Sequence, residues 1–425
     1  MPRLHVHEVA IENLRTLKDV RLRAEGLTVL IGENGSGKSS ILEGIELLRR
    51  VGENTFERDF QDVHGGAGLL LRAGTQRLAL EVTLTEHPPD RGDLSDTERL
   101  RYRVEVRGER GGRYDVDREI FESGRADSRV TFERRDTKVT RTSSGGVTEF
   151  EAPHRQLLTL PDVLRHDSVF DLREALARME VHVGFEVTPL WVARAHRRET
   201  ALRDRSQINR EARLSGLGTN LAAAYSTLKN EHPHTRRWGE VLGWIRLGLG
   251  YQIEDVLIQA AGAGFIELSI KQRGLDMPIR SAALSNGQLA WLAFVAMAYL
   301  GLVDGRPILA FDEPELHLHP ALLVRATELL TLVSQEHPVI IATHSRRILD
   351  ALGENAADAA VLCEYVQEQG ETRLRRFDRA ALRDWLEEYD GLGKILDAGY
   401  ERHVLSPPET RPQPQPHDHE NGRSK

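Results

Sequence analysis

The chain of 425 residues lacks several features that would place it in a specialised class of proteins. Its single cysteine, Cys363, excludes an intrachain disulfide and a four-cysteine zinc site. The longest apolar stretch, residues 289–303, is shorter than the roughly 20 residues that a membrane-spanning helix needs, so it predicts a buried helix and no membrane partner. The first residues show no signal-peptide pattern, so we expect a cytoplasmic protein.

The chain also has fewer basic than acidic residues. The chain has 57 lysine and arginine residues against 65 aspartate and glutamate residues, which gives a net charge of −8. A protein that coats nucleic acid without sequence preference would carry the opposite sign. This balance excludes such a coat but leaves room for a local basic groove. Arginine greatly outnumbers lysine, a bias that fits a GC-rich genome and does not by itself indicate phosphate binding.

Hydrophobic periodicity is present along most of the chain and predicts the fold class. Residues 27–31 form a continuous apolar run typical of a strand buried on both faces, and residues 39–50 show helical spacing. From residue 284 onward the pattern predicts a helix to about 300, a strand at 307–311, a helix at 321–335 and a strand at 338–342. This alternation indicates an α/β protein with a parallel sheet.

The middle of the chain has a different pattern. An alternating hairpin precedes residue 27, and the runs 69–72, 78–85, 102–107 and 129–133 predict an antiparallel β lobe inserted after the first helix. Residues 154–250 are mainly helical in pattern, and strand periodicity returns at 252–258 and 265–270. Residues 406–425 hold five prolines and almost no apolar side chains, which predicts a disordered tail.

One glycine-rich segment fits the phosphate-loop pattern G-x-x-x-x-G-K-[ST] at every required position, between the buried strand and the helix. The glycines let successive backbone N–H groups point at phosphate oxygens, and the helix N-terminus adds partial positive charge. Lys38 is expected to reach the β- and γ-phosphates of ATP, and Ser39 to ligate Mg²⁺. The predicted nucleotide contacts are Gly32, Asn34, Gly35, Ser36, Gly37, Lys38, Ser39 and Ser40.

An acidic pair follows the apolar run 308–311. Because ligands of parallel α/β sheets bind at the carboxyl ends of the strands, Asp312 is placed to hold Mg²⁺. Glu313 is placed to polarise the attacking water as a general base. A bare acidic turn is the alternative, and the phosphate loop elsewhere in the chain argues against it.

The segment Leu284-Ser285-Asn286-Gly287-Gln288 closely resembles the LSGGQ signature of ABC-type ATPases, with Asn286 in place of the first glycine. The resemblance implies that this turn closes over the γ-phosphate held by a second protomer, with Ser285, Gly287 and Gln288 as contacts. His344, just after the strand 338–342, matches the switch histidine of these ATPases. Gln61 is a candidate for their Mg²⁺-sensing glutamine, although it comes early in the chain.

With these motifs the chain resembles the RecF/SMC-like group of ABC-class ATPases, and also predicted bacterial AAA-type ATPases with an EPE-x-x-LHP element. Here that element is Glu313-Pro314-Glu315-Leu316-His317-Leu318-His319-Pro320, which we interpret as a dimer-interface loop rather than a zinc site. Long coiled-coil arms are absent. Only 425 − 344 = 81 residues follow His344, which leaves little room for an appended nuclease domain.

The resemblance implies a single P-loop NTPase of the ABC type over residues 1–405, followed by the tail. We expect an N-terminal ATPase part (1–68), a β insert (69–150), a helical lobe (151–250) and a part with the signature, the acidic pair and His344 (251–405). The expected function is a Mg²⁺-dependent ATPase that works as an ATP-sandwiched homodimer, acting on DNA or in DNA repair and genome maintenance. The alternative is an ATPase subunit of an anti-phage module that controls a separate effector nuclease.

A basic stretch offers a possible DNA contact. Between residues 191 and 213 seven arginines face three acidic residues, a local excess of 7 − 3 = +4 that could meet phosphates. A solvated helix face with ion pairs is the plainer interpretation. The arginines are Arg194, Arg197, Arg198, Arg203, Arg205, Arg210 and Arg213.

Overall fold

The computed structural model describes most of the chain. The described residues are 3–86, 99–109, 113–124, 129–152, 156–185, 187, 201–210, 213–216, 218–230, 235–389 and 391–406. Residues 407–425, which include nearly all of the predicted tail, lie outside them. In the part that is described, no helix is both long and apolar enough to cross a membrane.

A six-stranded sheet forms the centre of the molecule, with the order β10-β15-β16-β3-β17-β18. All neighbouring pairs are parallel except β17 and β18. The parallel sheet predicted from the strand and helix alternation is thereby confirmed. The strands are β3 (Leu27–Ile31), β10 (Glu180–Val183), β15 (Leu309–Asp312), β16 (Val339–Ala342), β17 (Ala360–Val366) and β18 (Glu371–Arg376).

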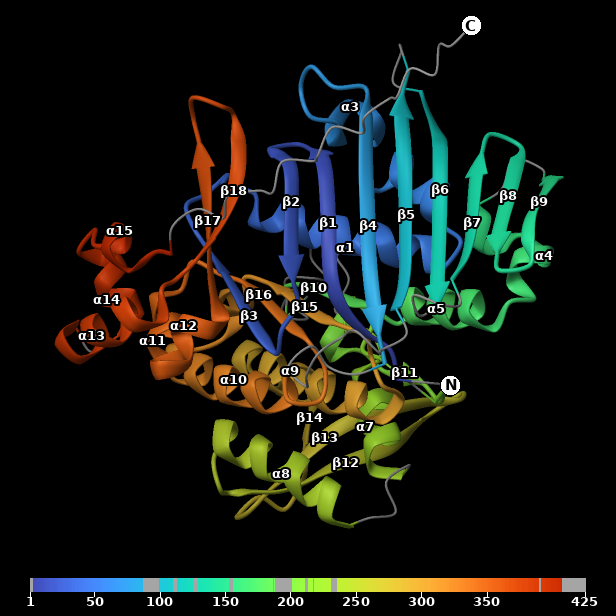
Figure 1. Ribbon diagram of the computed structural model, residues 1–425. Coiled ribbons are helices and arrows are strands. Elements are labelled where there is room, and N and C mark those ends of the chain that lie inside the picture. The colour runs from blue at the N-terminus through green and yellow to red at the C-terminus, as the bar shows by residue number, and fades with distance from the viewer. Residues whose placement is uncertain are drawn as a thin grey trace, which may run out of the picture.

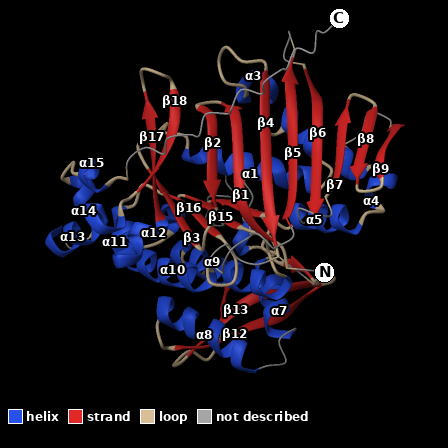
Figure 2. Cartoon of the chain, in the orientation of Figure 1, coloured by secondary structure: helices blue, strands red, loops and turns tan. Residues whose placement is uncertain are grey.

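The central sheet is covered on both faces, as its apolar strands require. Along β15, Ala310 packs into the same core as helix α1 (Lys38–Gly52), whereas Leu309 and Phe311 pack on the opposite face. Figure 2 shows helices gathered on that second side. They include α9 (Asn286–Asp304), α10 (Pro320–Val333) and α11 (Arg346–Leu352). Residues 289–300 of α9 are buried, so the apolar stretch is a core helix as predicted.

A second sheet lies beyond α1. Its eight strands are antiparallel neighbours in the order β2-β1-β4-β5-β6-β7-β8-β9. Figure 1 shows α1 and α5 (Asp167–Ala177) behind this sheet. The strands are β1 (His5–Leu14), β2 (Leu17–Arg23), β4 (Arg77–Thr85), β5 (Arg99–Gly108), β6 (Tyr114–Gly124), β7 (Val130–Arg135), β8 (Lys138–Ser143) and β9 (Gly146–Glu151).

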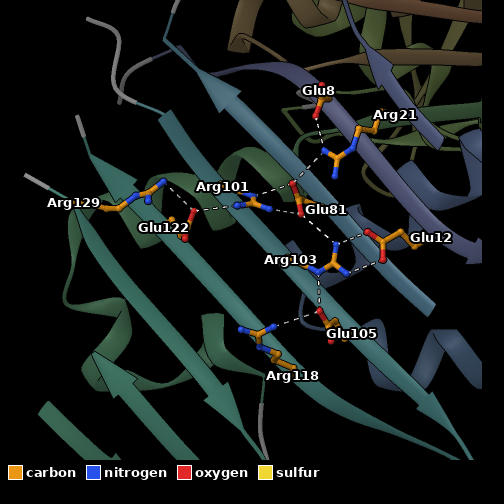
Figure 3. A network of polar contacts seen from close by, with 10 residues as sticks. All are labelled: Glu8, Glu12, Arg21, Glu81, Arg101, Arg103, Glu105, Arg118, Glu122 and Arg129. Atoms are coloured by element: carbon orange, nitrogen blue, oxygen red, sulfur yellow. Dashed lines mark hydrogen bonds and ion pairs between the residues drawn. The ribbon is translucent and has the colours of Figure 1, made fainter. Parts of the chain in front are cut away.

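The outer face of this sheet carries alternating arginines and glutamates. Figure 3 shows a network in which Arg101 and Arg103 both contact Glu81, and Arg103 also pairs with Glu12 at 2.9 Å. Opposite charges on neighbouring strands stabilise an antiparallel sheet because the side chains of facing residues lie close together. The dense mixed charge of this region is therefore satisfied within the sheet itself.

The remaining elements form two smaller groups. A small sheet has the order β11-β13-β12, with β14 paired to β13. Its elements and helices are β11 (Ser206–Gln207), α7 (Leu221–Asn230), α8 (Thr235–Leu249), β12 (Ile253–Gly262), β13 (Phe265–Gln272) and β14 (Ile279–Arg280). Shorter helices elsewhere are α2 (Phe56–Asp62), α3 (Gly66–Leu70), α4 (Pro161–Leu164), α12 (Ala356–Ala359), α13 (Arg379–Tyr389), α14 (Leu392–Asp397) and α15 (Glu401–Val404).

The antiparallel β lobe predicted after the first helix is present, and it extends a sheet that begins at the N-terminus. β1 pairs with β2 on one side and with β4 on the other, so one sheet continues across the expected boundary at 68/69. The expectation of a strand at residues 69–72 is wrong: Gly66–Leu70 is a short helix, and Leu71 makes an isolated bridge to Leu14. The left-handed φ of Gly65, 81°, allows the turn that starts this helix.

The strand β10 was not predicted, since it lies in a stretch of helical pattern. Its sequence Glu-Val-His-Val has two polar residues, yet Glu180 and His182 are both buried. Glu180 lies 3.4 Å from the buried Arg306 and 3.1 Å from His182, and these partners satisfy its charge. The strand can be buried because it pairs with β15 and because Arg306 neutralises Glu180.

The antiparallel sheet contains a buried ion pair whose contribution to stability can be measured. Arg134 Nε donates to Glu119 Oε2 at 2.6 Å, and both side chains are almost fully buried, with Tyr102 also donating to Glu119. We expect Arg134→Met to lower the free energy of unfolding by about 3–5 kcal/mol, because it leaves a buried carboxylate unpaired. Urea denaturation followed by circular dichroism measures this loss.

The neighbouring Arg135 gives a matched control. It pairs with Glu133 at 2.7 Å but is 67% exposed. Because water solvates both partners, Arg135→Met is expected to change stability little. Equal losses for the two variants would show that burial of the Arg134 pair has no special importance.

Candidate nucleotide-binding site

The predicted phosphate loop joins the end of β3 to the start of α1, and its backbone requires glycine at two positions. Gly37 has a φ of 100°, which other residues rarely adopt, and it precedes Lys38 directly. At Gly32 the φ is 152°, and a Cβ would lie 2.2 Å from the carbonyl oxygen of Cys363. The loop is therefore shaped by close approach to β17 as well as by its own turn.

The Lys38 ammonium lies inside the loop. Its Nζ donates to the carbonyl oxygens of Gly32 at 2.9 Å and Glu33 at 3.0 Å. Burial lowers the pKa of this ammonium, and the carboxylates of the Asp312 loop oppose that effect. No side chain caps the start of α1, so its first N–H groups point into the loop without a side-chain acceptor. A polyphosphate is the kind of ligand that satisfies both features.

A threonine distant in sequence supports the loop from behind. The Thr372 hydroxyl lies 2.9 Å from the carbonyl oxygen of Ser36 and 2.8 Å from the Thr16 hydroxyl. The Thr372 N–H also donates to the Thr16 carbonyl at 2.9 Å. The start of β18 and the turn between β1 and β2 thus hold the phosphate loop in place. No sequence motif indicated Thr372.

The acidic pair follows β15 and meets the loop at the same edge of the sheet. Glu313 has a left-handed φ of 50°, and its N–H donates to the Ala342 carbonyl at 2.8 Å. Such a conformation costs about 1–3 kcal/mol in a residue other than glycine and is often found at functional sites. It places Glu313 Oε1 3.4 Å from His344 Nε2, so the predicted base and the predicted switch histidine face each other.

A third carboxylate, which the sequence reasoning did not assign, fixes the histidine loop. Glu315 Oε1 accepts from the Thr343 hydroxyl at 2.6 Å and from the His344 N–H at 3.0 Å. Thr343 in turn accepts from the Ser345 N–H at 2.8 Å. The loop after β15 therefore sets the position of the loop after β16. The signal was present in the Glu-Pro-Glu run, but its partner could not be known from the sequence.

Asp312 has the environment expected of a cation ligand. Burial raises the pKa of its carboxyl, and the adjacent Ser39 hydroxyl and the Lys38 ammonium oppose that rise. Its Oδ1 is buried without a hydrogen-bond partner among the described residues. A hard cation such as Mg²⁺ prefers oxygen ligands of this type. Asp312 and Ser39 therefore fit the predicted Mg²⁺ site.

The signature turn is well formed and exposed. Ser285 caps α9: its Oγ accepts from the Gln288 N–H at 3.3 Å, while the Gln288 side chain accepts from the Ser285 N–H at 2.9 Å. Further along α9, Phe294 stacks on Phe311 with ring centroids 4.9 Å apart, level with the end of β15. The start of α9 therefore lies beyond the edge of the sheet where the phosphate loop opens. None of the contacts described for this turn reaches the chain's own phosphate loop.

The structure does not bring Gln61 to this site. Gln61 lies exposed on α2, and its side chain packs against Gly66 in the turn before α3. The described contacts include none between Gln61 and the carboxylates after β15. The strand next to β15 is β10, so the end of β10 occupies the place beside Asp312. The assignment of a Mg²⁺-sensing role to Gln61 remains a prediction from the resemblance alone.

Only some of the described arginines in the basic stretch, residues 191–213, are exposed. Arg203 is buried, and Arg213 donates to the Ala177 carbonyl at 2.8 Å and to Glu53 at 2.7 Å. Arg205 and Arg210 are exposed. The other three predicted contacts, Arg194, Arg197 and Arg198, lie outside the described residues. The predicted DNA contact region therefore loses two of its seven arginines to internal contacts.

The fold and the site together define a P-loop NTPase of the ABC type. The chain belongs to the family described as "AAA domain, putative AbiEii toxin, Type IV TA system", whose match covers residues 27–350. That range includes the phosphate loop, the signature turn, the acidic pair and His344. The resemblance to RecF/SMC-like ATPases stated from the motifs is confirmed at the level of this class.

Individual relatives are more distant. The "DNA replication and repair protein RecF" of Rickettsia massiliae is 44% identical over 49 residues, which is 11% of this chain and 14% of RecF. An SMC head bound to the C-terminal winged-helix domain of ScpA is 16% identical with a TM-score of 0.49, over 87% of this chain and 96% of that one. An SMC head from Pyrococcus furiosus, bound to the C-terminal domain of ScpA, is 14% identical with a TM-score of 0.49, over 91% and 99%.

The position of Glu315 generates a prediction about turnover. Glu315→Ala removes the acceptor for Thr343 and for the His344 N–H, so the histidine loop loses its link to the acidic loop. We expect kcat for ATP hydrolysis to fall roughly tenfold or more, because small displacements of reacting groups are costly. The KM for ATP is expected to change little, since the phosphate loop is untouched.

Steady-state phosphate release measures both constants, with Lys38→Ala as the blank. Glu336→Ala serves as the control, since Glu336 is exposed and lies 3.8 Å from Arg3, away from the site. A Glu315→Ala variant with raised KM and normal kcat would instead place Glu315 in nucleotide binding.

Proposed function

We propose that the chain is a Mg²⁺-dependent ATPase that binds and hydrolyses ATP as a nucleotide-sandwiched homodimer. One observation carries this proposal: the phosphate loop, the acidic pair and His344 meet at the carboxyl ends of β3, β15 and β16, three neighbouring parallel strands. Ligands of open α/β sheets bind at this edge.

The phosphate loop binds the nucleotide in this proposal. Lys38 turns from the two loop carbonyls that it now contacts to the β- and γ-phosphates, and the first N–H groups of α1 donate to phosphate oxygens. Asp312 and Ser39 would hold Mg²⁺, which would supply positive charge to neutralise the phosphates. Asp312 at the end of β15 and the two carboxylates that follow it, Glu313 and Glu315, make this edge acidic, and a bound cation would offset that charge.

Glu313 is the proposed general base. Its carboxylate is part-exposed, so a water molecule can reach it, and it accepts the proton of the water that attacks the γ-phosphate. His344 lies 3.4 Å from Glu313. It is therefore placed to contact the γ-phosphate that this water molecule attacks. Glu315 holds the backbone of His344 and so keeps this pair aligned.

The exposure of the signature turn supports a dimer. Ser285 and Asn286 are exposed, and their described contacts include none with the chain's own phosphate loop, so the turn is accessible to a second molecule. Apolar side chains at the same edge are also exposed: Val183 at the end of β10 by 72% and Leu316 after Glu313 by 60%. A second copy placed head to tail covers these residues and brings each signature turn to the other copy's nucleotide.

We infer that the ATPase acts on DNA, and the resemblance to RecF, named for DNA replication and repair, supports this. The second candidate is an ATPase subunit that controls a separate effector, such as a nuclease, in a defence module. Two observations favour it: the family description names a toxin of a toxin–antitoxin system, and two arginines of the basic stretch make internal contacts.

Glu313→Gln provides the main test of the site. The amide cannot accept the proton, so hydrolysis is expected to fall by about 10²–10⁴-fold, within the range that a general base contributes. ATP binding is retained, and the variant is expected to accumulate as an ATP-bound dimer in size-exclusion chromatography with light scattering. Wild-type turnover by Glu313→Gln would remove Glu313 from the mechanism.

The Ser285→Arg variant tests dimer formation separately from the binding of ATP by a single subunit. The bulky cation at the exposed turn is expected to block dimer formation, while a single subunit still binds ATP. Introduced into Glu313→Gln, it should abolish the ATP-dependent dimer. Normal ATPase activity of Ser285→Arg would contradict a composite site made by two subunits.

The two biological roles are distinguished by steady-state ATP hydrolysis with and without double-stranded DNA, again with Lys38→Ala as the blank. Stimulation that weakens as salt rises supports action on DNA, because phosphate contacts are salt-dependent. Turnover that is indifferent to DNA supports the effector-controlling subunit.

A further inference from the structure

A buried arginine holds the signature turn from behind. Arg203, at the end of the 3-10 turn Ala201–Arg203, is 6% exposed. Its Nη1 donates to the carbonyl oxygens of Leu284 at 2.6 Å and Ala282 at 3.1 Å, and its Nη2 donates to Asn286 Oδ1 at 2.6 Å. All three bonds end on residues 282–286, so one guanidinium fixes the whole turn that precedes α9.

The charge of Arg203 has no carboxylate partner among the described residues. Its Nε has no hydrogen-bond partner there either, and burial lowers the pKa of the guanidinium. A buried cation that is satisfied only by carbonyl and amide oxygens is unfavourable for stability compared with an apolar side chain of similar size. Its net positive charge lies directly behind the N-terminus of α9, which already favours anions.

Asn286 occupies the position where the ABC signature has glycine, and in this chain its side chain accepts a hydrogen bond from Arg203. A glycine there has no side chain to accept the 2.6 Å bond from Nη2. Asn286 lies between Ser285, which caps α9, and Gly287. The capping box uses the Ser285 oxygen as an acceptor, which leaves its hydroxyl hydrogen able to donate outward.

We propose that Arg203 is a positioning residue of the composite ATP site, which acts through Asn286 to aim the signature turn at the terminal phosphate of the nucleotide held by a second copy of the chain. The proposal rests on the sandwich dimer described above. Arg203 itself does not touch the nucleotide, because its side chain is buried and its Nη groups are used by the turn. The charge of Arg203, which has no carboxylate partner among the described residues, adds attraction for the phosphate at the start of α9.

The test uses Glu313→Gln as the parent, so that ATP stays intact. Self-association with ATP and Mg²⁺ is measured by analytical ultracentrifugation for Asn286→Gly, Arg203→Met and the double variant. Asn286 is exposed, so Asn286→Gly removes the bond to Arg203 without removing an apolar core side chain, which keeps the test usable even if Arg203→Met folds poorly. Arg205→Met is the matched control: Arg205 is an exposed arginine two residues away that contacts the Ala261 carbonyl.

Loss of one charge-assisted hydrogen bond is expected to weaken ATP-dependent association about tenfold in Asn286→Gly. Arg203→Met weakens association at least as much, and the double variant is no weaker than Arg203→Met, because both changes remove the same bond. Binding of a fluorescent ATP analogue to the single subunit stays at the parental level in every variant. Arg205→Met associates like the parent.

Unchanged association of Asn286→Gly, or losses that simply add in the double variant, would overturn the role of Arg203 and leave the sandwich dimer intact. A parent that stays monomeric with ATP gives a different result. It refutes the sandwich dimer, and this inference fails with it. The two failures are therefore distinguished within one set of measurements.

Discussion

The hydrogen-bonded register of β3, β16 and β15 is the constraint on which the site depends. These parallel strands pair residue by residue, so Leu30, Ala342 and Asp312 lie at the same level of the sheet. Each strand is followed at once by a functional loop, and all three loops open at one edge. Because the strands are buried on both faces, a slip in register would move apolar side chains into the wrong layer. The packing of the core therefore fixes the geometry of the site.

Polar bonds from distant parts of the chain refine that geometry. Thr372 bonds the phosphate loop, Glu315 bonds the histidine loop, and Arg203 bonds the signature turn. A single hydrogen bond of this kind contributes only about 0.5–1.5 kcal/mol to stability. These bonds matter here for orientation, since each one joins a motif to a segment that is remote in the sequence. The functional loops are thus supported by residues that perform no chemistry.

The large antiparallel sheet has a different relation to the site. It covers α1 with an apolar inner face and satisfies its many charges across neighbouring strands on the outer face. Through the turn that contains Thr16 it also reaches the phosphate loop. The sheet therefore also supports the loop that is predicted to bind the nucleotide. Its long charged face leaves few unpaired cations for phosphates in the network that Figure 3 shows.

The sequence by itself determined the class of protein and the parallel core, and it predicted most of the residues that meet at the candidate site. The phosphate loop, the acidic pair and His344 could be predicted because each follows a strand whose apolar run is local and unambiguous. The tertiary structure alone decided which segments support those motifs. β10 and the joined eight-stranded sheet depend on pairing partners far along the chain, and hydrogen bonds between strands leave no periodic trace in either partner alone. The roles of Glu315, Thr372 and Arg203 likewise arise from contacts between remote segments. A side chain's identity shows what bonds it can make, but only the fold decides which partner it meets.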